Sequence, residues 1–247
     1  MGRGPGLRLP PHAVARPPRR ADLAHPCDRG ARLARLRQDH EQADRWQAAA
    51  DEIQADICAN GLDGRGVFTQ AYGSTALDAS LLLMPLVRFL PADDERIRKT
   101  VLAIAHELTV DGLVLRYKTE ETDDGLSGRE GSFTICSFWM VSALVEIGEL
   151  DRARRMCEKL LSFASPLGLY GEEIDPETGR HLGNFPQAFT HLALINAVMH
   201  VIQAEAPAAA AGQPGRPRRD RAATRRGPAP LDARDGESGA PQGARKG

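Results

Sequence analysis

The chain has 247 residues and a net charge of −1, so it is long enough to bury one substantial core or two small ones. The charge is uneven: residues 41–205 carry 26 acidic and 14 basic side chains, whereas the flanks together carry 7 acidic and 18 basic. The flanks are rich in Ala, Arg, Pro and Gly, and such sequence buries too little apolar surface to offset the entropy of ordering it. We therefore predict disordered tails at residues 1–28 and 206–247 and a folded domain at 29–205.

Composition also argues against several classes of function. The Arg-rich tails have no interleaved aromatic residues and no helical stripe, so we expect no nucleic-acid binding. The most apolar run, residues 77–90, is too short and too charged to span a membrane. Prolines interrupt the first 26 residues, which therefore lack the apolar core of a secretory signal. The four cysteines show no CxxC spacing, so we predict no metal site and no disulfide framework. A cytoplasmic location is the expectation.

The central part of the chain is predicted to be a series of helices. The first contains apolar residues at helical spacing and stops at Asn60-Gly61, a pair typical of a helix C-terminus. Acidic residues open the third helix, and Pro186 opens the last at a first-turn position. The predicted helices cover about residues 43–59, 77–89, 93–108, 133–147, 150–164 and 186–204.

The connections between these helices alternate in length. Residues 61–75, 109–131 and 165–185 form long Gly-rich loops, whereas residues 91–92 and 148–149 form tight turns. In an up-and-down array every second connection lies at the same end, so the three long loops are expected to converge. The buried helices recur about every 55 residues, which is typical of an open solenoid or a closed toroid of helix pairs.

The third long loop carries the most informative residues. From this loop into the start of the last helix, residues 170–191 read YGEEIDPETGRHLGNFPQAFTH and hold two adjacent carboxylates, Glu172 and Glu173, between Gly and Pro residues. Acidic side chains held near aromatic rings and backbone polar groups are typical of sites that cleave sugars. By composition alone, such a pair is more often a solvated part of a loop.

Three segments together closely resemble glycoside hydrolase family 15, which includes glucoamylases, glucodextranases and bacterial trehalases. They read YGSTALDASLLLMPLVRFLPADD at residues 72–94, RYKTEETDDGLSGREGSFTICSFW at residues 116–139, and the loop at residues 170–191. The resemblance covers about residues 29–199. It implies an all-α fold of about six helices, the second half of an (α/α)6 barrel.

The resemblance also implies roles for individual residues. Glu172 matches the general base that activates water in an inverting hydrolysis, and Arg116 matches an arginine that hydrogen-bonds sugar hydroxyls. Tyr117, Glu130 and Glu173 are expected to contact the sugar. The implied substrate is an α-glucosidic oligosaccharide or trehalose, with no metal or other cofactor. We therefore expect the side chains of Arg116, Glu130 and Glu172 to meet around one hollow.

One departure limits the expected activity. The family's general acid lies in an earlier segment rich in tryptophan and glutamate, and upstream of Cys27 this chain has only Asp22 as an acid. We therefore expect an inverting α-glucosidase-type hydrolase with little activity alone. The alternative is a non-catalytic helical-repeat scaffold or a truncated gene product. The exposed edge of half a barrel further predicts self-association.

Overall fold

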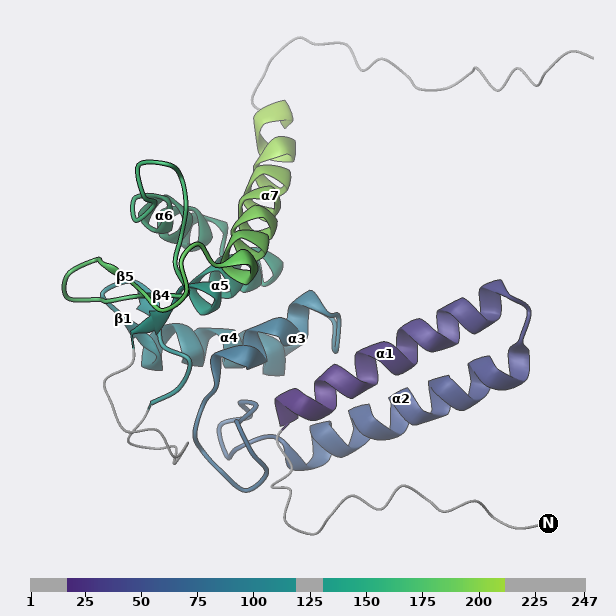
Figure 1. Cartoon of the computed structure of the whole chain (residues 1–247). Helices are drawn as coiled ribbons and strands as arrows, with labels where there is room; N and C mark the ends of the chain where they lie inside the picture. The colour runs from purple at the N-terminus through teal and green to yellow at the C-terminus, as the bar shows by residue number, and fades with distance from the viewer. Residues whose placement is uncertain (1–16, 119–130, 212–247) are drawn as a thin grey trace, which may run out of the picture. The chain divides into compact units, whose positions relative to one another are not determined.

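The computed structural model describes residues 17–118 and 131–211, with side chains described at 25–118 and 131–206. Within these residues the chain is mostly helical (Figure 1). The helices are α1 (Pro17–Leu36), α2 (His40–Asn60), the 3-10 helix η1 (Ala79–Leu82), α3 (Leu83–Leu86), α4 (Glu95–Glu107), α5 (Thr134–Glu146), α6 (Leu150–Leu161) and α7 (Ala188–Ala211).

Short antiparallel strands lie in or next to the second and third long loops and pair with one another. Strands β1 (Thr109–Val110) and β2 (Leu113–Val114) form one pair. The strands β3 (Ser132–Phe133), β4 (Glu173–Ile174) and β5 (His181–Leu182) form a three-stranded sheet with β4 in the middle. The sheet brings the end of the second long loop against the third.

Local capping explains where several helices begin and end. The Asp39 side chain accepts a hydrogen bond from the Gln42 backbone N–H at the start of α2, and Gly61 N–H donates to Ile57 O at its end. The Asp94 side chain accepts from Arg96 N–H at the start of α4. Such caps satisfy backbone groups that have no partner within the helix. The predicted ends at Asn60-Gly61 and near Asp94 are confirmed.

The predicted helix over residues 77–89 is instead divided into η1 and α3. Asp78 caps η1 by accepting from Ser80 N–H, and Pro85 lacks the backbone donor that a longer helix would use. The chain then leaves helical geometry at Arg88, which has a φ of 59°. An apolar run that is buried on all sides does not by itself distinguish one long helix from two short ones.

Helix α1 includes residues 17–28, which the sequence predicted to be irregular. It runs side by side with α2, as Figure 1 shows. Gly30 permits this approach, because a Cβ at that position would meet the Trp46 ring at 3.2 Å. Ala31 and Ala43 are fully buried between the two helices.

Helix α5 is the centre of the core. It contacts α3, α4, α6, α7 and β2. Its residues are buried around most of its circumference, as expected for an inner helix. The outer helix α6 buries one stripe and exposes its arginines. Among the described residues, no helix combines the length and apolarity that a bilayer-spanning segment needs.

We predict that Phe138→Ala destabilises the fold by about 3–5 kcal/mol, because it leaves a cavity in a close-packed core. Phe138 is fully buried, and its ring packs edge to face on Tyr170 with the ring centroids 5.6 Å apart. Chemical denaturation monitored by circular dichroism measures the change. Leu167→Ala is the control, since Leu167 is 83% exposed. Equal losses in the two variants would contradict this assignment of the core.

We predict that Asp94→Asn lowers the free energy of unfolding by an amount that depends on pH. The hydrogen bond from Arg96 is the main cause that holds the pKa of Asp94 below its ordinary 3.8. The unfolded chain therefore binds this proton more readily, so the stabilisation is present above the ordinary value and is lost as the pH falls below it and through the lowered pKa of the folded state. Because asparagine still caps the helix, we expect a loss of about 0.5–1 kcal/mol at pH 7 and a smaller loss at pH 2. Urea unfolding at both pH values tests this.

Candidate active site

The second and third long loops meet at the β3–β4–β5 sheet. Helix η1, which follows the first long loop, reaches the second loop where Ala79 N–H donates to Arg116 O at 2.8 Å. The second reaches the third where Phe133 is paired with Glu173 across the sheet. Strand β2 also contacts β3. Among the described residues, the expected convergence is therefore observed for the second and third long loops.

Glu172 lies just before β4, with its backbone held from both sides. Its N–H donates to Asn184 O, and its carbonyl accepts from Thr134 N–H, each at 2.9 Å. Its carboxylate Oε2 accepts from the Asn184 side-chain amide at 2.9 Å and from the Asn184 backbone N–H at 3.2 Å. Oε1 has no hydrogen-bond partner among the described residues. The carboxylate is thus oriented through one of its two oxygens.

Glu173 is directed differently from its neighbour. Its Oε2 accepts from Gly131 N–H at 2.8 Å, on the β3 side of the sheet, whereas Glu172 reaches Asn184 beyond β5. Successive side chains of an extended strand point to opposite faces, which explains the divergence. The two adjacent acids therefore occupy separate environments.

Arg116 and Tyr117 lie together beside the sheet. The Arg116 guanidinium carbon is 5.4 Å from the centroid of the Tyr117 ring and 5.7 Å from that of Phe133. Both distances fit cation–π contacts. Since Phe133 is the cross-strand partner of Glu173, these contacts connect Arg116 to the strand that follows Glu172.

Buried polar groups surround the backbone at Arg116. Asp78 is 7% exposed, and its Oδ2 accepts from the Gln70 amide at 3.4 Å. Burial, with a smaller contribution from the nearby Asp78, raises the pKa of the Cys136 thiol to about 12, although Arg116 partly opposes both. Cys136 is therefore a neutral core residue at physiological pH, not a nucleophile.

The base of the Glu172 loop is held by a buried aromatic cluster. Tyr170 is 1% exposed, and its hydroxyl donates to Leu160 O at 3.0 Å. Its ring packs edge to face against His181 and His191. His181 Nδ1 accepts from Gly171 N–H at 2.9 Å, so this histidine orders the backbone immediately before Glu172. Both histidines have structural contacts here.

The described residues therefore bring Arg116, Tyr117, Glu172 and Glu173 to adjoining parts of one sheet and its loops. Glu130 lies outside the described residues. Asn184 and Phe133 also contact these residues, although neither was among the site residues predicted from the sequence. The pairing of β4 with β5, with Glu173 opposite Leu182, would have predicted the Asn184 contact. No group of histidine, cysteine, aspartate and glutamate within the described residues is arranged to hold a metal.

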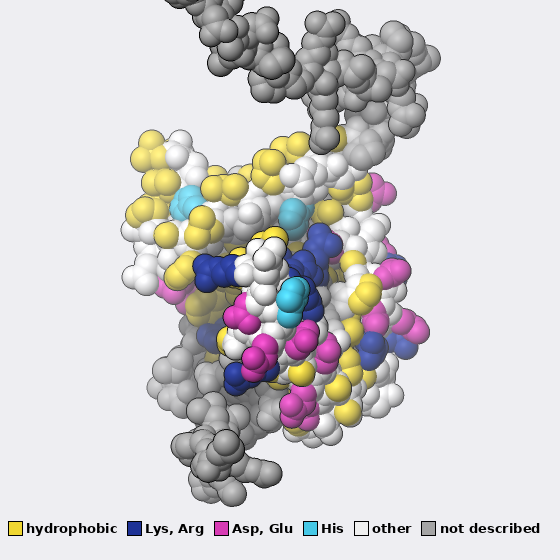
Figure 2. Space-filling view, turned by 90° about the vertical axis from the view of Figure 1, so that its right-hand side faces the viewer, with side chains coloured by type: hydrophobic (Ala, Val, Ile, Leu, Met, Phe, Trp, Pro, Cys, Tyr) yellow, Lys and Arg dark blue, Asp and Glu magenta, His cyan; other side chains and the backbone are white. Residues whose placement is uncertain are grey.

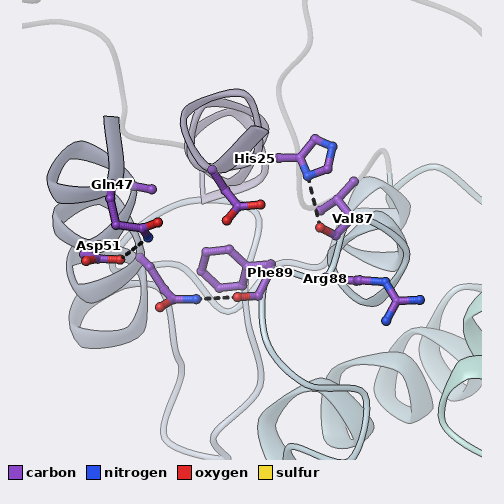
Figure 3. A pocket seen from close by; sticks show the side chains of 9 residues that line it. His25, Gln47, Asp51, Val87, Arg88 and Phe89 are labelled. Atoms are coloured by element: carbon purple, nitrogen blue, oxygen red, sulfur yellow. Dashed lines mark hydrogen bonds between the residues drawn. The ribbon is translucent and has the colours of Figure 1, made fainter. Parts of the chain in front are cut away.

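A small cavity of about 120 Å³ lies elsewhere, between α1, α2 and the segment after α3 (Figure 3). His25 Nδ1 is 3.1 Å from Val87 O, and the Gln54 amide donates to Phe89 O. Gln47 donates to Asp51. Figure 3 shows Arg88 pointing away from these groups. The polar groups of this cavity hold the α1–α2 pair to the rest of the core.

Solved structures identify the class of fold. The bacterial glucoamylase complexed with acarbose matches with a TM-score of 0.65 at 16% identity, over 76% of this chain and 34% of that chain. Glucoamylase from Saccharomycopsis fibuligera matches with a TM-score of 0.62 at 10% identity, over 78% of this chain and 56% of that one. The predicted class, all-α and corresponding to part of an (α/α)6 barrel, is confirmed.

Sequence comparison then identifies the family. The model for "Glycosyl hydrolases family 15" matches residues 23–199, so the chain belongs to that family. It is 71% identical over 185 residues to the trehalase of Mycolicibacterium smegmatis, covering 75% of this chain and 28% of that trehalase. The trehalase of Mycobacterium tuberculosis is also 71% identical over 185 residues, or 27% of its length. The chain thus spans less than a third of these curated relatives.

We predict that Gly183→Ala costs more stability than Gly148→Ala. Both glycines have a positive φ, 70° and 82°, so each alanine suffers backbone strain. A Cβ at Gly183 would also meet Glu172 Oε2 at 2.9 Å and Glu172 Cβ at 3.0 Å, whereas nothing lies within 4 Å at Gly148. The expected difference in unfolding free energy is about 1–3 kcal/mol, measured by urea denaturation. Equal losses would mean that Glu172 is not packed against Gly183.

Proposed function

We propose that this chain contributes the general base and part of the sugar-binding wall of an inverting α-glucoside hydrolase, acting on trehalose or a related α-glucoside. Family membership and the 71% identical trehalases support the substrate class. The observation that carries the proposal is the Glu172 carboxylate, which is held through one oxygen by Asn184 while the other has no partner among the described residues.

In the proposed reaction, Glu172 Oε1 accepts a proton from a water molecule as the water oxygen attacks the anomeric carbon. The hydrogen bonds from Asn184 to Oε2 limit rotation of the carboxylate, so little reorientation is needed during proton transfer. The attack occurs on the face opposite the departing sugar, which inverts the anomeric configuration. Gly183 leaves room for this carboxylate because it has no side chain.

Arg116 is proposed to donate hydrogen bonds to the hydroxyls of the bound glucosyl unit. Its guanidinium offers several donors in one plane, and the rings of Tyr117 and Phe133 hold that plane in place. Glu173 and Glu130 are proposed to accept from further hydroxyls. Tyr117 would pack its ring against the sugar.

The leaving sugar also needs a proton from a second carboxyl group. Glu172 is proposed to act only as the base. The general acid is proposed to lie outside the three segments that resemble the family. General acid catalysis contributes roughly 10²–10⁴-fold to such reactions. We therefore propose that this chain alone cleaves natural α-glucosides weakly or not at all.

An activated substrate tests the base separately from the acid. Fluoride leaves α-glucosyl fluoride without protonation, so its hydrolysis depends on the base and not on the acid. We predict that the purified chain releases fluoride from this compound with β-glucose as the first product, and that trehalose is turned over at least about 100-fold more slowly. A fluoride electrode and proton NMR of the product provide the measurements.

The matched variants are Glu172→Gln and Glu177→Gln, which change two acids of the same loop. Loss of fluoride release to background in the first, with the second unchanged, supports the proposed base. Equal rates in both variants, or α-glucose as the first product, would rule out Glu172 as the base of an inverting reaction. Circular dichroism confirms that each variant is folded.

A further inference from the structure

Two histidines bind the backbone of the two residues that precede Glu172. His191 Nε2 accepts from Tyr170 N–H at 3.3 Å, and His181 Nδ1 accepts from Gly171 N–H at 2.9 Å. The rings come from different elements, since His181 begins β5 and His191 lies in the first turn of α7. The chain has seven histidines, and those on the face shown in Figure 2 lie apart from one another. Two rings on one loop are therefore a local concentration.

Close packing fixes both rings in place. Each packs edge to face on the Tyr170 ring, with centroid distances of 6.0 Å for His181 and 5.9 Å for His191. Gly171 allows the approach of His181, because a Cβ at that position would meet His181 Cβ at 3.1 Å and Nδ1 at 3.3 Å. Tyr170 and Gly171 are buried, so the ring nitrogens are the acceptors that their N–H groups need.

The second nitrogen of each ring faces a backbone carbonyl. His181 Nε2 is 2.9 Å from Phe163 O, and His191 Nδ1 is 2.7 Å from Gln187 O. A carbonyl oxygen only accepts, so the nitrogen beside it carries a proton, whereas the nitrogen beside a backbone N–H carries none. His181 is therefore the Nε2–H tautomer and His191 is the Nδ1–H tautomer. Both rings are neutral in this arrangement.

Proton uptake by either ring removes an acceptor from this loop. A protonated imidazole donates from both nitrogens and accepts at neither. Protonated His181 would point an N–H at Gly171 N–H, and protonated His191 would point one at Tyr170 N–H. A buried donor without an acceptor is unfavourable, so the ring or the loop backbone has to move. Imidazole side chains ordinarily take up this proton between about pH 5 and 8.

The groups around the two rings supply no charge that would hold such a proton. Tyr170 faces both rings and Cys157 of α6 lies close to Tyr170; burial raises the pKa of both, which are therefore neutral near pH 7. Among the described residues, no carboxylate forms an ion pair with either histidine. The other titratable side chains on the surrounding elements have partners of their own, are exposed or are neutral in the core: Glu172, Glu173, Asp175, Arg180, Arg154, Glu158 and Cys136.

We propose that His181 and His191 are positioning residues for Glu172 and hold it in place only while both rings are neutral, a role that rests on the proposed function of Glu172 as the base. Neither histidine touches the substrate. They act through Tyr170 and Gly171, on the side of Glu172 away from β4. Acidification through the histidine titration should therefore loosen the loop and slow the reaction, and a return to neutral pH should restore both.

Nuclear magnetic resonance of the full chain tests the proton-dependent contacts without any activity. Long-range proton–nitrogen correlation spectra at about pH 8 should show the Nε2–H tautomer for His181 and the Nδ1–H tautomer for His191. On acidification, the amide signals of Gly171 and Tyr170 should shift with the same midpoints as the rings that they contact. The opposite tautomer in either ring, or amide signals that do not follow the rings, would overturn the proposal.

Variants that accept but do not titrate test the effect on the base. The side-chain oxygen of asparagine falls near the Nδ1 position and that of glutamine near the Nε2 position, so His181→Asn combined with His191→Gln keeps both acceptors. Fluoride release from α-glucosyl fluoride should fall between about pH 7.5 and 5.5 at least about tenfold more in the wild type than in this double variant, because a misplaced catalytic group costs up to about 100-fold.

Two further variants separate positioning from simple packing. His181→Leu removes the acceptor for Gly171 at every pH and should be slow throughout, whereas the double variant that keeps its acceptors should not. His40→Gln is the control, because His40 is exposed at the start of α2, and it should keep the wild-type pH profile. Circular dichroism at each pH confirms that every variant is folded.

The outcomes distinguish this inference from the proposed function. Fluoride release that is absent, or that Glu172→Gln leaves unchanged, would reject Glu172 as the base and with it the positioning role, while the spectra would still decide the proton-dependent contacts. Release that depends on Glu172 but falls equally with pH in the wild type and the double variant would overturn the positioning role and leave the base in place.

Discussion

The candidate site depends on one antiparallel pairing, in which β4 is held between β3 and β5. This register places Glu173 opposite both Phe133 and Leu182. It also fixes Glu172 between the backbones of Thr134 and Asn184. A shift by one residue would exchange the directions of the two adjacent glutamates, because side chains alternate along a strand. The chemical difference between these glutamates is therefore a consequence of strand register.

The short sheet gains its rigidity from the helices at its ends. Phe133 directly precedes α5, and Thr134 is the first residue of that central buried helix. On the other side of the sheet, Tyr170 is buried in the core and directly precedes Gly171 and Glu172. Strands of two residues have few hydrogen bonds of their own. Their geometry is thus set by a packed helix and a buried aromatic ring, which also position Arg116 over Phe133.

Sequence patterns predicted the helices from α2 onward well because burial repeats at helical spacing, and caps such as Asp94 act locally. They failed for residues 77–89, where apolar side chains all round hid the 3-10 geometry that begins at Ala79 and the end of the helix before Arg88. The resemblance to family 15 predicted roles for Arg116 and Glu172 but not the contacts around their side chains. Asn184 lies 12 residues from Glu172, and its amide reaches the carboxylate only through the β4–β5 pairing. Such long-range pairing has no local signal in the sequence.

The first turns of α7 are hydrogen-bonded to the start of the loop that carries Glu172. Gln187 N–H donates to Tyr170 O at 2.9 Å, and the Thr190 hydroxyl donates to Gly171 O at 3.2 Å. His191 accepts from Tyr170 N–H. These contacts anchor the residues just before Glu172 to the first turns of α7. Because α7 also packs on the central helix α5, the position of Glu172 depends on the α5–α7 packing as well as on the short sheet.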